Sequence, residues 1–180
     1  MFNNIFENKI LNNNSPVLVM GLNDKVQASY VWNLLGASKK NILVVTNTLY
    51  EANLLYKSLN QYDQDNILLF PMDDFLVSEV VATSPDLMSK RIETLNELAK
   101  NNIGKIVITN FMGYLRFLPS RKLWSSLNIN IKETDEINRD LLIQKLNMIG
   151  YKKDSIVTKT GEYANRGYIL DVFPYGYENP

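Results

Sequence analysis

The sequence predicts an α/β protein, in which a parallel sheet with flanking helices is followed by a small α+β domain. Short apolar runs bounded by Gly or Pro alternate with longer amphipathic segments, which is typical of buried parallel strands and their connecting helices. After Phe117 this alternation stops and shorter, more polar segments follow. We therefore expect one domain over residues 1–118 and a second over residues 119–180.

Four continuous apolar runs are predicted as the strands of the parallel sheet. They are residues 17–20, 41–46, 67–70 and 105–109. Apolar residues recur at helical spacing between these runs. The helices are therefore expected over residues 25–35, 49–61 and 86–100. Asp24 suits the N-cap of the first helix, Gly36 ends it, and Pro85 stands at the start of the third. The weak pattern over residues 1–14 predicts a short helix or arm.

The second domain is predicted to open with a linker containing one short helical turn, followed by a weak edge strand, a helix and two antiparallel strands. These elements are expected over residues 119–126, 128–131, 139–150, 155–158 and 167–173. Gly150 provides the C-terminal stop of the helix.

The composition excludes several classes of function. The 19 basic residues balance the 19 acidic ones, the pI is about 6.3, and the chain contains neither His nor Cys. A dedicated nucleic-acid-binding module would usually carry a basic stripe. Without His or Cys we expect no zinc site, no disulfide, and no thiol or imidazole catalysis. No apolar run reaches the roughly 18 residues that span a membrane, and the start lacks the order of a signal peptide, so a cytoplasmic protein is expected.

The loop after the first predicted strand is where a nucleotide-binding α/β protein would hold a phosphate. A P-loop needs Gly-x-x-x-x-Gly-Lys-Ser/Thr, whose backbone N–H groups, lysine and hydroxyl bind phosphate and Mg²⁺. Residues 21–28 lack the second glycine, the lysine at its required position and the hydroxyl. Asp24 adds negative charge there, and Lys25 alone is a weak anion signal. Gly21, Asp24 and Lys25 therefore mark a degenerate loop, and we expect no cofactor.

Two other groups of side chains are weak candidates for chemistry. Asp73, Asp74 and Glu79 could form a metal or acid–base site, but adjacent carboxylates after a strand are more often solvated loop residues or helix caps. We therefore expect no catalytic and no metal-binding residue. Some tyrosines could stack on nucleic acid, although no basic track accompanies them. They are Tyr62, Tyr151 and Tyr163.

Arg166 is the strongest candidate for a recognition residue. It lies between Asn165 and Gly167 in a turn that is expected to join two short β-patterned runs. The planar guanidinium group suits bidentate binding of a carboxylate, and arginines often anchor protein interfaces. Two simpler interpretations remain open: an ordinary turn arginine, or an internal pair with Glu162. We expect the Arg166 side chain to be exposed to solvent.

Alternation along residues 167–173 predicts that both faces of this strand carry large apolar side chains. The two sets are Ile169, Asp171 and Phe173 on one face, and Tyr168, Leu170 and Val172 on the other. Both faces should therefore be at least partly covered.

Several motifs together resemble a family of bacterial DNA-repair proteins that includes UvrB and the transcription-repair coupling factors (Mfd). The most specific one is residues 161–174, Gly-Glu-Tyr-Ala-Asn-Arg-Gly-Tyr-Ile-Leu-Asp-Val-Phe-Pro, which is similar to the family's GE(F/Y)xxRGxxLDxFP segment. Weaker similarities lie at Leu69–Asp74, at Ser84-Pro85 with the helix that follows, and at Gly150-Tyr151.

The resemblance implies a degenerate RecA-like first domain and a small second domain that binds UvrA. The chain lacks the intact P-loop and the long tyrosine-rich hairpin of UvrB, which favours the N-terminal UvrB-like module of a transcription-repair coupling factor. UvrA-binding residues are then implied at Arg166 with its motif neighbours Glu162, Tyr163, Asn165 and Gly167.

The function implied by the resemblance is a non-catalytic, UvrA-recruiting module in transcription-coupled nucleotide excision repair. The family's ATP-dependent DNA translocase motor, and its contacts with RNA polymerase and double-stranded DNA, would lie outside these residues. The chain stops at Pro180 where another strand is expected, so we expect a fragment whose small domain is truncated. Two alternatives remain open: a P-loop-like ATPase domain with an altered nucleotide loop, and a UvrB-like DNA-binding fragment.

Overall fold

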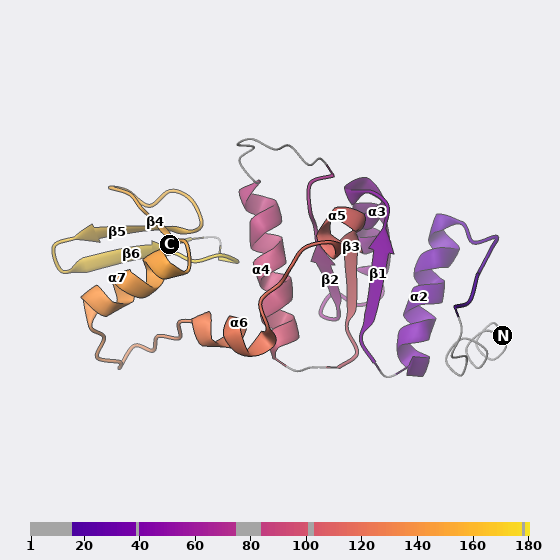
Figure 1. Ribbon diagram of the computed structural model, residues 1–180, viewed down its shortest axis with the longest axis horizontal. Helices are drawn as coiled ribbons and strands as arrows, with labels where there is room; N and C mark the ends of the chain where they lie inside the picture. The colour runs from indigo at the N-terminus through magenta and orange to yellow at the C-terminus, as the bar shows by residue number, and fades with distance from the viewer. Residues whose placement is uncertain (1–15, 39, 75–83, 101–102, 178) are drawn as a thin grey trace. The chain divides into compact units, whose positions relative to one another are not determined.

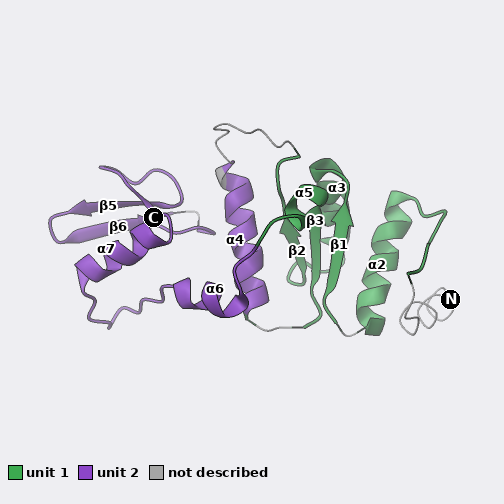
Figure 2. Cartoon of the chain, viewed as in Figure 1, with its two compact units in different colours: residues 1–83, 100–117 green, residues 84–99, 118–180 purple. Residues whose placement is uncertain are grey.

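The computed structural model describes residues 16–38, 40–74, 84–100, 103–177 and 179–180. Contacts divide the chain into two compact units. The first is residues 1–83 with 100–117, and the second is residues 84–99 with 118–180 (Figure 2). The helix that begins at Pro85 is predicted from the sequence as part of the first domain. By its contacts it belongs to the second unit.

The first unit contains a parallel three-stranded sheet. Strands β1 (Ile42–Thr46), β2 (Ile67–Phe70) and β3 (Ile106–Asn110) lie in the order β1-β3-β2 (Figure 1). Every residue of the central strand β3 is buried, as expected for a parallel strand covered on both faces. The predicted α/β fold class and these three predicted strands are confirmed.

Helices α2 (Asp24–Ser38), α3 (Leu49–Leu59) and α5 (Phe111–Tyr114) complete the first unit. Helix α3 contacts all three strands and α2 contacts α3. The Thr48 hydroxyl caps the start of α3, which fixes where the helix begins. The core consists of apolar side chains from the helices and strands: Ala28, Ala52, Leu59, Ile67, Leu69, Ile106 and Ile108.

Two expectations for the start of the first unit are wrong. Residues 17–20 form no strand, and Leu18 and Met20 are 83% and 80% exposed. An apolar run becomes a strand only where a neighbour supplies hydrogen bonds, and in the described part of the chain β1 and β2 each pair with β3 alone. The N-cap of α2 is Asn23, whose side-chain oxygen accepts a hydrogen bond from the Val26 N–H at 3.0 Å. Asp24 is instead the first residue of the helix.

The second unit combines three helices with a small mixed sheet. Its elements are α4 (Pro85–Ala99), α6 (Arg121–Leu127), α7 (Arg139–Met148), β4 (Lys152–Lys153), β5 (Glu162–Arg166) and β6 (Ile169–Phe173). The strand order is β4-β5-β6, with β4 parallel to β5 and β5 antiparallel to β6. A small α+β fold therefore follows the parallel sheet, as the sequence predicts.

Polar contacts between α4 and α6 explain why these helices group together. The Arg121 guanidinium donates to the carbonyl of Ala99 at 2.8 Å, and the Trp124 indole N–H donates to the Asn96 side chain at 2.9 Å. The Ser120 hydroxyl caps the start of α6. The segment predicted as a linker with one helical turn is thus a capped helix tied to α4.

Two strand predictions in the second unit are wrong. Residues 128–131 and residues 155–158 form no strand. The antiparallel partner of β6 is β5, which follows the loop at 155–161. The Glu162 side chain accepts hydrogen bonds from backbone N–H groups of that loop, so these donors are not available to a strand.

Candidate protein-interaction site

The tightest turn of the second unit joins β5 to β6. Arg166 and Ile169 are the last paired residues of the two strands, so only Gly167 and Tyr168 form the turn. Gly167 has a φ of 60°, the positive value that tight hairpin turns need at their first central position. The glycine after Arg166 is therefore required by the backbone, and it places the arginine at the tip of a short hairpin.

Arg166 is exposed, as predicted, and is paired within the hairpin. Its side chain is 61% exposed, and its guanidinium group donates to the carboxylate of Asp171 on β6. Because Arg166 is opposite Ile169, Asp171 occupies the diagonal position on the same face of the sheet. The sequence analysis left open a pair with Glu162, and the structure shows Asp171 in that role instead.

Glu162 stabilises the loop that precedes β5. Its carboxylate accepts hydrogen bonds from the backbone N–H groups of Thr158 and Lys159, at 3.0 and 2.9 Å. These donors hold the pKa of the Glu162 carboxyl below its ordinary value, because they stabilise the charged form. The contacts of Glu162 are therefore directed at its own loop.

Tyr163 fixes the hairpin against α7. Its side chain is 2% exposed, and its hydroxyl donates to the Asn147 side chain at 2.9 Å. Gly161, two residues before it, has a φ of 81°, and a Cβ there would lie 2.1 Å from the Tyr175 hydroxyl. The Gly-Glu-Tyr part of the motif is thus explained by packing and backbone geometry.

The tip of the hairpin is tied to the first turn of α7. The Arg139 guanidinium donates to the backbone carbonyl of Gly167 at 2.7 Å and lies 3.5 Å from the Asp140 carboxylate. The side-chain oxygen of Asn165 is buried and accepts no hydrogen bond from the described residues. Of the five motif residues implied in recognition, Arg166 and Gly167 are exposed. The other three, Glu162, Tyr163 and Asn165, are buried or half-buried.

A groove lies beside this ion pair. Arg166 and Asp171 line it together with mainly apolar residues: Ile131, Ile137, Leu142, Ile156, Val157, Leu170, Val172 and Pro180. Both faces of β6 are partly covered, as predicted, since the residues of the strand that follow Ile169 are all half-buried. The charged pair therefore borders an apolar surface.

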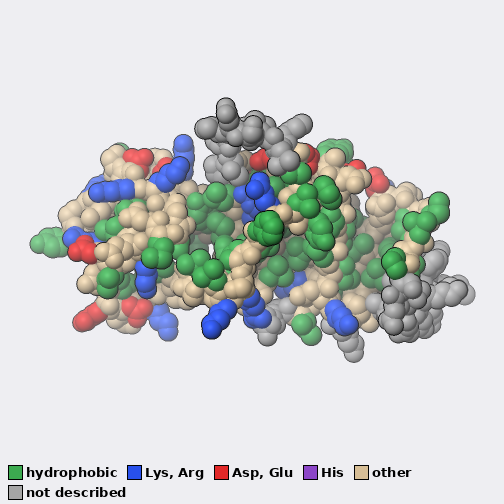
Figure 3. Space-filling view, in the orientation of Figure 1, with side chains coloured by type: hydrophobic (Ala, Val, Ile, Leu, Met, Phe, Trp, Pro, Cys, Tyr) green, Lys and Arg blue, Asp and Glu red, His purple; other side chains and the backbone are tan. Residues whose placement is uncertain are grey.

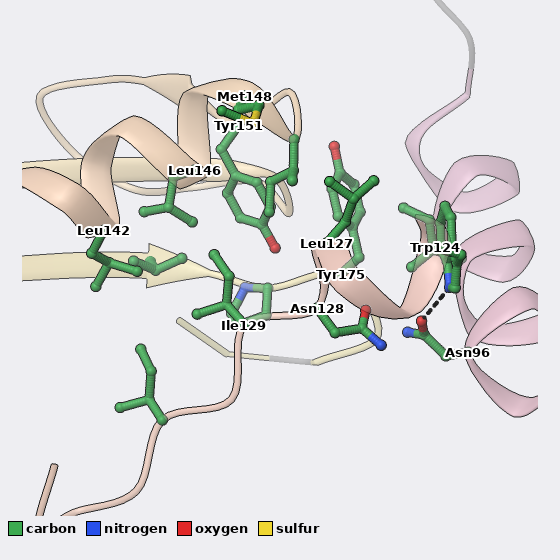
Figure 4. A pocket seen from close by; sticks show the side chains of 15 residues that line it. Asn96, Trp124, Leu127, Asn128, Ile129, Leu142, Leu146, Met148, Tyr151 and Tyr175 are labelled. Carbon is green, nitrogen blue, oxygen red and sulfur yellow. Dashed lines mark hydrogen bonds between the residues drawn. The ribbon is translucent and has the colours of Figure 1, made fainter. Parts of the chain in front are cut away.

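A second pocket of about 470 Å³ in the second unit is lined by no charged side chain among the described residues. Figure 4 shows Leu142 and Leu146 of α7 on one side and Trp124, bonded to Asn96, on the other. Burial raises the pKa of the Tyr151 hydroxyl, so it is neutral at physiological pH. This pocket offers apolar surface and no acid–base pair.

The degenerate loop of the first unit has the contacts of an ordinary helix start. Asn23 caps α2 with its own side chain, and the Gln27 N–H donates to the Asn23 carbonyl at 2.8 Å. Asp24 and Lys25 are exposed, and Gly21 has a φ of 80°. The residues where a phosphate would bind therefore include a capping side chain and a carboxylate, neither of which suits an anion.

The carboxyl ends of β2 and β3 are closed by a polar network. The Asn110 side chain donates to the carbonyl of Met72 at 2.7 Å and to the Asp74 carboxylate at 2.6 Å. Asp74 also accepts from the Leu49 N–H at 2.8 Å, so it caps α3 together with Thr48. Asp74 is thus a helix cap, one of the two alternatives weighed from the sequence, and Glu79 lies outside the described residues.

The tyrosines considered as stacking platforms are engaged within the protein. Tyr62 stacks on Trp32 with ring centroids 5.7 Å apart, and Tyr151 packs edge-on against Tyr175 at 5.5 Å. Tyr163 is buried. On the face shown in Figure 3, basic and acidic side chains of the described residues are interspersed within each unit.

The described residues offer neither a metal site nor a membrane span. Among them, no group of three or more acidic side chains is placed to hold a metal ion. No helix in this part of the chain has both the length and the apolar character needed to cross a membrane.

Comparisons with known proteins agree with the motif at the hairpin. Residues 129–180, which contain α7 and the sheet β4–β6, match the family model of the UvrB interaction domain. This segment of the chain is therefore similar to the UvrB interaction domains.

The similarity to single proteins extends over most of the chain. The chain is 32% identical over 158 residues to a transcription-repair-coupling factor of Staphylococcus aureus (strain bovine RF122 / ET3-1). This match covers 87% of the chain and 13% of that protein. The match to the transcription-repair-coupling factor of Staphylococcus haemolyticus (strain JCSC1435) is also 32% identical, and covers 88% of this chain and 14% of that protein. The resemblance stated from the sequence is confirmed, and the chain spans a small share of the length of these curated relatives.

Sequence reasoning proposed Arg166 as a recognition residue but missed the residues that position it. Asp171 lies within the quoted motif, and alternation alone does not reveal that it is diagonal to Arg166, because that requires the register of β5 and β6. Arg139 and Asn147, both contacts from α7 to the hairpin, carry no local sequence signal.

Proposed function

We propose that the second unit is a docking module that recruits UvrA, in a protein that acts in transcription-coupled nucleotide excision repair. The family match over residues 129–180 and the similarity to transcription-repair-coupling factors support this proposal. The observation that carries it is the exposed Arg166 at the tip of a hairpin, where the neighbouring motif residues Glu162 and Tyr163 are committed to the fold.

The mechanism proposed is recognition without a chemical step. Asp171 holds the guanidinium group in one orientation, which lowers the entropy that binding would cost. An exposed ion pair contributes only about 0.5 kcal/mol, so a carboxylate of the partner can share or replace Asp171 at little expense. Arginine has five N–H donors, and the pair with Asp171 leaves a planar group for bidentate contact with UvrA.

We propose no catalytic role for these residues. The capped helix start at Asn23 and the network around Asn110 support this proposal, because both use the groups that would otherwise meet a nucleotide. ATP binding with Mg²⁺ is the direct test. Calorimetry should detect no saturable binding, and a dissociation constant below about 100 μM, or about −5.5 kcal/mol, would restore the ATPase alternative.

The remaining activities belong, in this proposal, to other parts of a longer protein. The relatives are much longer than this chain, and we expect an ATP-dependent DNA translocase motor and contacts with RNA polymerase and double-stranded DNA in their additional length. We place the protein in the cytoplasm, where excision repair meets transcription in bacteria.

Binding of the chain to immobilised UvrA tests the proposal. Arg166→Ala should weaken binding at least tenfold, about 1.4 kcal/mol, because a charged interface contact is lost. Arg166→Lys should recover only part of the affinity, since lysine lacks the planar fork. Arg116→Ala is the matched control, because Arg116 is also exposed but lies in the first unit. Equal UvrA affinities for Arg166→Ala and wild type would reject the hairpin as the recognition site.

A further inference from the structure

The side chain next to the recognition arginine has no role in the fold. Tyr168, the second residue of the turn between β5 and β6, is 101% exposed. Its strand neighbour Ile169 is 60% exposed. Two large apolar side chains thus stand at the tip of a hairpin that already carries an exposed arginine.

Turn chemistry does not explain a tyrosine at this position. Tight turns favour Gly, Asn, Asp or Ser, whose small side chains tolerate positive φ or bond to the backbone. Gly167 already supplies the positive φ that the turn needs. A tyrosine that buries nothing leaves about 200 Å² of largely apolar side chain in water. The fold therefore makes no use of this exposed side chain.

The backbone beneath Tyr168 is held in place. Pairing of β5 with β6 continues to Arg166 and Ile169, directly on either side of the turn. From α7, Arg139 bonds the Gly167 carbonyl at 2.7 Å, within one residue of Tyr168. A side chain presented on a fixed turn loses little entropy on binding, and tyrosine has only two side-chain torsions to order.

We propose that Tyr168 is the apolar anchor of the UvrA contact. Its ring enters an apolar pocket on UvrA, and a carboxylate at the rim of that pocket pairs with Arg166. This inference rests on the proposed function and adds the chemistry of the partner surface: an apolar hole beside an acidic side chain. Tyr and Arg are the residue types that most often dominate interfaces, and they do so where water is excluded around them.

The test compares UvrA affinities of the whole chain with single substitutions at the tip. Tyr168→Ala should weaken binding at least tenfold, mainly through faster dissociation. Tyr168→Phe should stay within about threefold of wild type, because the ring enters an apolar pocket. Tyr177→Ala is the matched control: Tyr177 is in the same unit and 68% exposed, and its loss should leave affinity unchanged. The melting temperatures of all variants should agree with wild type, since the Tyr168 side chain is fully exposed and that of Tyr177 largely so.

The outcomes separate this inference from the proposed function. If Arg166→Ala weakens UvrA binding and Tyr168→Ala does not, the anchor is rejected while the docking function stands. Wild-type affinity for both variants would reject the hairpin as the recognition site and the anchor with it. Absence of UvrA binding by the wild-type chain would reject the docking function itself. An aromatic ring can also stack on bases, so binding to a single-stranded DNA oligonucleotide is measured in parallel. Loss of DNA binding in Tyr168→Ala with unchanged UvrA binding would overturn the proposal in favour of base stacking.

Discussion

Removing the side chain of Asn110 should test whether the network at the carboxyl ends of β2 and β3 is a structural element. Asn110 is 0% exposed and its side chain makes three hydrogen bonds. Two join the backbone N–H and carbonyl of Met72, at 3.1 and 2.7 Å, and one joins the Asp74 carboxylate at 2.6 Å. Asn110→Ala removes all three without touching the apolar core.

The expected loss of stability follows from the kind of bond removed. A neutral hydrogen bond contributes about 1 kcal/mol and one to a charged group about 2 kcal/mol, so the three sum to about 4 kcal/mol. Asp74 is exposed and regains water in the variant, which offsets part of the loss. We expect Asn110→Ala to lower the free energy of unfolding by about 3 kcal/mol. Asn110→Asp should cost more near neutral pH than in acid, since it places a second carboxylate beside Asp74.

Urea denaturation followed by far-ultraviolet circular dichroism measures this difference. Asn130→Ala is the control, because Asn130 is an exposed asparagine in the other unit. It should change the free energy of unfolding by less than about 0.5 kcal/mol. A loss below about 1 kcal/mol for Asn110→Ala would show that water replaces the network freely and that the network does not hold the carboxyl ends of β2 and β3 together.

Three further predictions concern the second unit. Glu162→Gln should lower the melting temperature near neutral pH. Because the pKa of Glu162 lies below its ordinary 4.5, its stabilisation is present above that pH and is lost as the pH falls through the lowered value. The deficit of the variant should therefore shrink in acid, and a constant deficit from about pH 7 to pH 3 would contradict the bonding described. Gly161→Ala should lower the free energy of unfolding by about 2 kcal/mol or more, measured by denaturation, since alanine would have to adopt a φ of 81° and its Cβ would collide with the Tyr175 hydroxyl. An unchanged free energy of unfolding would contradict the close approach of Tyr175 to Gly161. Tyr163→Phe should lower the free energy of unfolding by about 1 kcal/mol, because its hydrogen bond to Asn147 is lost. In the double variant, Asn147→Ala should lower that free energy little further.

The sequence predicts those elements whose signal is local. β1, β2, β3 and α3 lie close to their expected residues because apolar runs and amphipathic periodicity need no knowledge of the rest of the chain. The run at residues 17–20 has the same local signal and forms no strand, because a strand also needs a partner. The order β1-β3-β2 is a property of pairing, and no single segment encodes it.

The candidate site was predictable to the same extent. The glycine after Arg166 indicated a turn, and a turn side chain is exposed, so the exposure of the arginine followed from local chemistry. Its partner depended on the register of two strands, one of which was assigned to the wrong residues. Asp171 and Arg139 could therefore be found only in the folded chain.

The chain contains two tryptophans, and each unit holds one of them. Trp32 stacks on Tyr62 in the first unit, whereas Trp124 is bonded to Asn96 in the second. Replacing either one with phenylalanine leaves a single tryptophan, whose emission reports only its own unit. Paired denaturation curves from the two variants would then reveal whether the α/β unit and the docking unit open together or one before the other. Quenching of Trp124 alone on addition of UvrA would locate the contact without any attached label.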